Sequence, residues 1–166
     1  MADLAELLMF EHSSIRIFSK YKRDNLPIEF FKEFNHYLVY DHVAVEEKVL
    51  FPVIVDNDWE DRQEFAKTVS RIQADHKLIE TLANNIIRWY ESGDMDLYSR
   101  RIPDFYRILT DHNLSEEDQI FPKWKLIDDS RKDKAIKDAV EIIESDDKAN
   151  YLDKTGFSEE LIKYMI

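Results

Sequence analysis

Residues 41–52 read DHVAVEEKVLFP and residues 111–122 read DHNLSEEDQIFP, so one twelve-residue pattern occurs twice in the chain. Six of the twelve positions are identical, and Leu50 and Ile120 form a conservative pair. A Phe-Pro pair is typical of a helix end, but helix capping explains neither the Asp-His pair nor the Glu-Glu pair. The repeat therefore predicts two helices that carry the same chemical groups.

Glycine and proline are scarce, with two Gly and four Pro in 166 residues, and this composition is typical of an all-α protein. Amphipathic spacing divides the first 128 residues into four long helices. We expect the first from an Asp3 cap to about Arg23, the second from Pro27 to Phe51 and Pro52, the third from an Asp58 cap to Ser92 and Gly93, and the fourth from between Asp94 and Pro103 to Phe121 and Pro122.

Short polar connections make long neighbouring helices antiparallel, so residues 1–128 are predicted to form an up-down-up-down four-helix bundle. Residues 129–166 are predicted to form additional C-terminal helices that pack on this bundle. One of them is an amphipathic helix over about 130–145, and the other is a short helix capped at Ser158.

Charge and composition exclude several classes of function. The net charge is −12, which repels the phosphates of nucleic acids and anionic lipid headgroups, so neither is expected as a partner. Cysteine is absent, which excludes disulfides, iron–sulfur clusters and thiol catalysis, and any metal must be bound by nitrogen and oxygen. With no long apolar run and no cationic leader, we expect a cytoplasmic protein without a membrane span.

The repeat places a histidine and a glutamate together on one helix face. Residues four apart share a face, so His42 projects with Glu46, and His112 projects with Glu116. Apolar residues lie on the same face as His42, which turns this pair toward the bundle interior. The second glutamate of each pair is rotated by roughly 140° from its histidine and is predicted to meet solvent. These outer residues are Glu47 and Glu117.

The first and third helices each carry one further histidine on their apolar stripe. A single core histidine is usually a hydrogen-bonded structural residue, but four of them with two glutamates in register favour a metal site, because unpaired buried charges cost several kcal/mol. The candidate ligands are His12, His42, Glu46, His76, His112 and Glu116. His36 is rotated away from His42 and is expected on the surface.

Other polar residues are candidates for supporting roles. Each candidate ligand histidine follows an acidic residue, which either orients an imidazole or is a solvated surface charge. Glu80 should face inward as a seventh ligand, a proton relay or, as we favour, the ion-pair partner of Arg16. Tyr106 is a second candidate proton relay. The acidic residues that precede the histidines are Glu11, Asp41, Asp75 and Asp111.

The ordered pattern His, His-x-x-x-Glu, His, His-x-x-x-Glu over about residues 4–126 resembles the haemerythrin-like (haemerythrin HHE cation-binding) family. The resemblance implies a non-haem di-iron centre, with two iron ions joined by an oxo or hydroxo bridge. It further implies that Glu46 and Glu116 bridge the two ions and that the four histidines are terminal ligands.

The third helix departs from the oxygen carriers of that family. Those proteins have a His-x-x-x-His pair there, whereas the partner positions of His76 are Ile72 and Glu80. The four-histidine set looks more like that of the di-iron proteins that repair iron centres and respond to nitric oxide.

Three functions are compatible with the pattern, and it decides neither enzymatic activity nor a protein partner. The first is binding or reaction of O₂, NO or peroxide at a carboxylate-bridged iron pair, as in iron-centre repair or a stress response. The second is reversible O₂ carriage or storage, or iron binding without catalysis. The third is a structural or zinc-bound bundle, because nitrogen and oxygen ligands bind several divalent metals.

Overall fold

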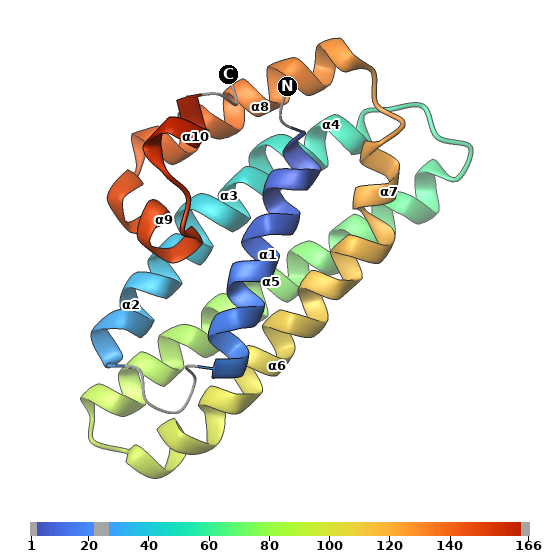
Figure 1. Ribbon diagram of the computed structural model, residues 1–166. Coiled ribbons are helices and arrows are strands. Elements are labelled where there is room, and N and C mark those ends of the chain that lie inside the picture. The colour runs from blue at the N-terminus through green and yellow to red at the C-terminus, as the bar shows by residue number, and fades with distance from the viewer. Residues whose placement is uncertain (1–2, 22–26, 164–166) are drawn as a thin grey trace.

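The computed structural model describes residues 3–21 and 27–163, and all regular structure in these ranges is helical. Four long rods lie side by side and alternate in direction (Figure 1). Three of them are α1 (Leu4–Tyr21), α5 (Arg62–Glu91) and α6 (Met95–Gln119), and the fourth, between α1 and α5 in the sequence, consists of several consecutive helices. The predicted all-α bundle is confirmed. The expected end of the first helix near Arg23 lies outside the described residues.

The second rod is not a regular α-helix, contrary to the sequence prediction. It contains two wide π turns, in which the N–H of Val43 bonds to the carbonyl of Leu38 and the N–H of Phe51 bonds to the carbonyl of Glu46. The ring of Pro52 would collide with the carbonyl four residues earlier in a regular helix, and a wide turn just before it relieves that contact. The rod comprises α2 (Ile28–Tyr37), η1 (Leu38–His42), α3 (Val43–Val45), η2 (Glu46–Leu50) and α4 (Phe51–Val55).

The starts of α5 and α6 differ, because Asp61 before α5 makes no side-chain capping hydrogen bond and Asp94 before α6 makes one. The third long helix, α5, begins at Arg62 after Asp61, so the predicted cap at Asp58 is wrong. The fourth, α6, begins at Met95, where the Asp94 carboxylate accepts the N–H of Leu97 at 3.2 Å. Helix α6 ends at Gln119, before the predicted end at Phe121 and Pro122, and this Phe-Pro pair instead begins a new short helix, α7 (Phe121–Trp124).

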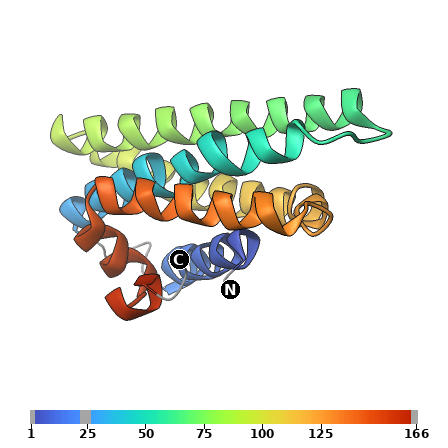
Figure 2. The same cartoon turned by 90° about the horizontal axis from the view of Figure 1, so that it is seen from above.

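The C-terminal residues form three helices, α8 (Asp129–Ser145), α9 (Lys148–Thr155) and α10 (Glu159–Lys163). The first and last agree with the sequence prediction, and Ser158 Oγ accepts the N–H of Leu161 at 3.2 Å. Helix α9 was missed, although Asp147 caps its start and Gly156, with a φ of 75°, ends it. Helix α8 lies along the bundle against α1 and α3, and α9 contacts α1 and α2 (Figure 2).

A continuous apolar core runs through the bundle and under α8 and α9. It includes Trp124, which is fully buried. In the middle of this core lies a group of buried histidines and glutamates. Among the described residues, no helix combines the length and the apolar character that crossing a membrane requires.

Candidate metal centre

Six buried side chains from the four rods converge in the bundle core. They form two groups that share both glutamates, and within each group one possible ligand atom of every residue lies within 4.8 Å of the others. One group is His12, His42, Glu46 and Glu116, and the other is Glu46, His76, His112 and Glu116. The structure therefore brings together all six residues that the sequence nominated as ligands.

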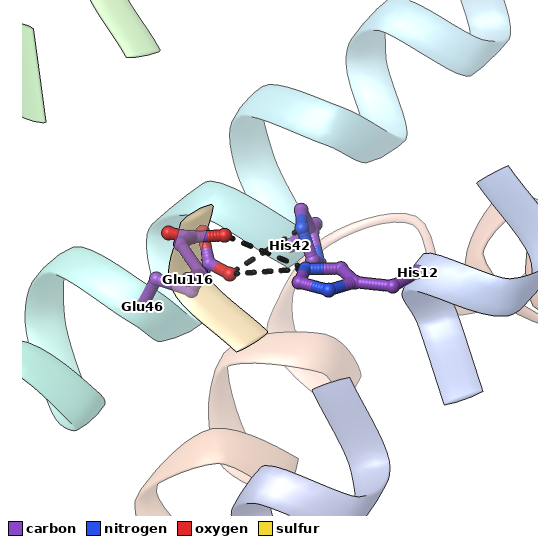
Figure 3. A group of neighbouring side chains, drawn as sticks. All are labelled: His12, His42, Glu46 and Glu116. Atoms are coloured by element: carbon purple, nitrogen blue, oxygen red, sulfur yellow. Dashed lines mark ion pairs between the residues drawn. The ribbon is translucent and has the colours of Figure 1, made fainter. Parts of the chain in front are cut away.

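The Nε2 atoms of the four histidines point at the two carboxylates. Glu46 contacts both groups, because its Oε1 lies 3.4 Å from His42 and its Oε2 lies 3.3 Å from His76. Glu116 also contacts both groups, because its Oε2 lies 3.5 Å from His12 and its Oε1 lies 3.5 Å from His76. The same Oε2 lies 3.4 Å from His112. His12 completes the first group, at 3.5 Å from Glu116 and 3.7 Å from Glu46 (Figure 3).

These atoms fit metal coordination better than they fit hydrogen bonding. The four Nε2 atoms and the four carboxylate oxygens are buried and have no hydrogen-bond partner among the described residues. Two ligands bound at about 2.1 Å to one ion lie about 3.0 Å apart at 90° and about 3.4 Å apart at 109°. The observed separations of 3.3–3.7 Å agree with such a geometry. The residues present therefore fit a pair of divalent cations.

The electrostatics of the metal-free cluster are those of a cation site. Burial lowers the pKa of His76, but the carboxylates of Glu116 and Glu46 outweigh it and raise that pKa to about 11. Burial raises the pKa of Glu116, but His112, His12 and His76 bring it well below its usual value. In the metal-free chain a protonated imidazole therefore balances the charge of the ionised carboxylates, and metal ions would take the place of such protons.

Each imidazole also faces a second carboxylate through its Nδ1 atom, and that carboxylate comes from a different helix. The pairs are Glu11 with His42 at 2.6 Å, Glu47 with His76 at 2.9 Å, Glu117 with His12 at 3.0 Å and Asp75 with His112 at 3.9 Å. The prediction that Glu47 and Glu117 meet solvent is therefore only partly right, because both side chains are partly exposed but each also contacts an imidazole of a neighbouring helix. Both lie on a flank of their helix that faces a neighbouring helix, and their side chains are only 35% and 18% exposed.

The phenylalanines of the repeat hold the same two rings. Phe51 stacks on His76 with ring centroids 5.9 Å apart, and Phe121 stacks on His12 at 5.4 Å. Phe51 follows Glu47 by four residues, and Phe121 follows Glu117 by four residues. The glutamate and the phenylalanine therefore share one helix face and fix one imidazole between them.

The acidic residues before the histidines do not orient their own neighbours. Glu11 faces His42 rather than His12. Asp111 is exposed and lies near Arg107. Asp41 is fully buried, and neither of its carboxylate oxygens has a hydrogen-bond partner among the described residues.

Other predicted supporting residues lie differently from the expectation. Arg16 faces α6 and binds Glu117 at 2.5 Å, so its predicted pairing with Glu80 is wrong. Glu80 is exposed.

Tyr106 is buried among aromatic rings, and its hydroxyl has no hydrogen-bond partner among the described residues, so no bond links it to the cluster. His36 lies outside the cluster and pairs with Asp146 at 2.7 Å.

A cavity of about 290 Å³ borders the cluster between the second rod and α5. Three of the four histidines line it, and His12 does not. Its walls are mainly apolar, and exposed polar side chains line its outer part. The apolar residues are Leu38, Val39, Val43, Ala44, Ile79 and Leu109, and the exposed polar ones are Lys48, Lys77 and Glu80. A small molecule can therefore approach the cluster from this side.

Comparison with known proteins identifies one family. Residues 3–124 match the family described as the "Hemerythrin HHE cation binding domain". No curated protein and no solved structure matches the chain. The match includes all six clustered residues and ends before α8.

Proposed function

The chain belongs to the haemerythrin HHE cation-binding family, and from this premise we propose that it is a di-iron protein that binds or reacts with O₂, NO or peroxide. The observation that carries the proposal is the pair of four-residue groups that share Glu46 and Glu116. Each group offers two imidazoles and two carboxylates, a ligand set that suits iron as well as other divalent metals.

The six clustered residues would hold the two ions, and an iron pair would supply electrons to a small ligand. The surrounding residues hold the imidazoles in place and leave a path for a small ligand. The carboxylates of Glu47 and Glu117 and the rings of Phe51 and Phe121 fix two imidazoles, which keeps their Nε2 atoms directed at the cluster. The cavity, whose walls are mainly apolar, gives a ligand of a few atoms access to the cluster.

The four-histidine set favours reaction over reversible carriage. It leaves fewer neutral ligands than the oxygen carriers have, since Ile72 is buried in the core and Glu80 is exposed, so neither joins the cluster. Each ion would then keep a position for an exogenous ligand. A task in iron-centre repair or in a stress response is consistent with this arrangement.

Iron quantification, combined with visible spectra of the reduced protein before and after exposure to O₂ and NO, tests the proposal. We expect about two iron ions per chain, oxidation in air within minutes and a spectral change with NO. A colour that persists for hours in O₂ and disappears under vacuum would instead indicate a carrier. Zinc in protein purified from its native host, or one metal per chain, would overturn the di-iron assignment.

A further inference from the structure

The sequence repeat relates the two halves of the cluster, but two residues outside the repeat, Glu11 and Asp75, face its histidines at different distances. Glu47 supports His76 in the same way that Glu117 supports His12, with distances of 2.9 and 3.0 Å. The remaining two histidines differ. Glu11 lies 2.6 Å from His42, and both side chains are 1% exposed.

The corresponding pair in the other half is much looser. Asp75 lies 3.9 Å from His112, beyond hydrogen-bond distance, and its side chain is 41% exposed. Aspartate is one methylene shorter than the equivalent Glu11, which accounts for the shorter reach. The Nδ1 atom of His112 has no hydrogen-bond partner among the described residues.

A residue from outside the matched family region reinforces the tighter pair. Tyr151 of α9 donates a hydrogen bond from its hydroxyl to Glu11 Oε1 at 2.7 Å, while Glu11 Oε2 faces His42. Tyr151 is fully buried. Burial and the nearby Glu11 charge raise the pKa of Tyr151 well above its usual value, so the hydroxyl keeps its proton and acts as a donor.

Helix α9 is held in place on the bundle by contacts beyond Tyr151. Ser14 of α1 donates to the carbonyl of Thr155 at 3.0 Å, and Lys154 binds Glu33 of α2 at 2.9 Å. Tyr151 is therefore presented to Glu11 by a fixed element. No equivalent residue supports Asp75 among the described hydrogen bonds.

A carboxylate that accepts the Nδ1–H of a ligating imidazole fixes its tautomer and its ring orientation and makes its Nε2 more basic. We propose that the two metal positions are unequal, and that Tyr151 is a positioning residue that acts through Glu11 on His42 to make the His12–His42 position the tighter one. The inference rests on the proposed pair of metal ions, but it depends neither on iron nor on any reaction.

Titration of the metal-free full chain with Co²⁺, followed by calorimetry and the visible spectrum, tests this inference. The wild-type chain should bind two ions in two separate steps. Tyr151→Phe should weaken the first step by about tenfold or more and leave the second within about twofold. Tyr106→Phe is the matched control, because it also removes a buried hydroxyl but touches no cluster residue, and it should change neither step.

A second variant changes the other half of the cluster and leaves the buried pair of Glu11 and His42 intact. Asp75→Glu lengthens the exposed acid to the size of Glu11 and should tighten the second step toward the first. In the metal-free chain, NMR of ¹⁵N-labelled imidazoles should show that Tyr151→Phe shifts the His42 resonances and leaves those of His76 and His112 in place. A general loss of packing would move all three.

Several outcomes overturn the inference. These are two equal steps in the wild type, an unchanged first step in Tyr151→Phe, or equal weakening of both steps. Two Co²⁺ steps that respond to Tyr151, in a chain that lacks iron or ignores O₂ and NO, would refute the proposed function alone. Two unequal steps that ignore Tyr151 would refute its positioning role alone.

Discussion

The carboxylate of Glu117 lies 3.0 Å from Nδ1 of His12, on a different helix. Phe121, one turn later, stacks on the same imidazole, and Glu47 with Phe51 holds His76 in the same way. Each copy of the repeat therefore has two tasks. Its histidine and first glutamate enter the cluster, and its second glutamate and phenylalanine orient the histidine of a neighbouring helix.

Removing the second glutamate should therefore weaken metal binding. Glu47→Ala takes away the acceptor of His76 Nδ1, and we expect about a 10- to 100-fold loss of metal affinity. Glu46→Ala should cost more, because Glu46 contacts both groups. Competition with chelators of graded strength measures both losses. Glu80→Ala, which removes an exposed carboxylate on α5, is the control and should leave affinity unchanged. Equal affinities in Glu47→Ala and Glu80→Ala would contradict this supporting role.

All six clustered residues were predicted from the sequence because their positions depend only on the phase of individual helices. A histidine and a glutamate four residues apart share a face whatever surrounds them. The partners of the Nδ1 atoms were not predicted. The helical period gives the angle between the side chains of Glu117 and His112 around their helix. It does not tell which neighbouring helix Glu117 faces, and in the structure that helix is α1.

The sequence also left two features of the fold unpredicted. The π turn at η2 accommodates Pro52, the structure gives no local reason for the one at η1, and apolar periodicity does not report a single wide turn. Helix α9 is only eight residues long, and its apolar content is too low for a clear stripe. Its cap signals at Asp147 and Gly156 were present, but the contact of Tyr151 with Glu11 joins residues 140 positions apart.

Metal should stabilise the fold. The clustered side chains come from all four rods, so an ion bound by them ties the rods together and binds the native state only. An ion present at 1,000 times its Kd adds about 4 kcal/mol to the free energy of unfolding. Thermal unfolding with and without Fe²⁺ under anaerobic conditions should show a higher Tm with metal. Glu46→Ala should lose most of that increase, and an equal increase in the variant would indicate binding elsewhere.

Asp41 should make the metal-free chain less stable as the pH rises. Burial, followed by the nearby Asp146, Glu11 and Asp147 carboxylates, raises the pKa of Asp41 to about 8. Because this pKa is above the unfolded value, the native state binds more protons between about pH 4 and pH 8, and stability falls across that window. Asp41→Asn cannot ionise, so its Tm advantage over the wild type should grow up to about pH 8 and then level off.

Asp111→Asn is the matched control for that measurement. Asp111 occupies the equivalent position of the second repeat, but its side chain is 65% exposed, so its Tm difference from the wild type should vary little with pH. An advantage of Asp41→Asn that is the same at pH 5 and pH 8 would show that Asp41 is ionised throughout.

The cavity beside His42, His76 and His112 should control how fast exogenous ligands reach the metal. Val43→Trp places an indole in this cavity of about 290 Å³, which is lined by Val43 but not by His12. We expect the metal content to stay at the wild-type level, because Val43 belongs to neither four-residue group. The rate of NO binding to the reduced protein, measured by stopped-flow absorbance, should fall by about tenfold or more. An entering ligand would then have to displace packed side chains before it reaches the metal. Ser13→Trp is the control, because Ser13 lines a separate cavity beside Glu117 that none of the four histidines borders. A slower rate in Ser13→Trp with an unchanged rate in Val43→Trp would place the entry path on the α1 side instead.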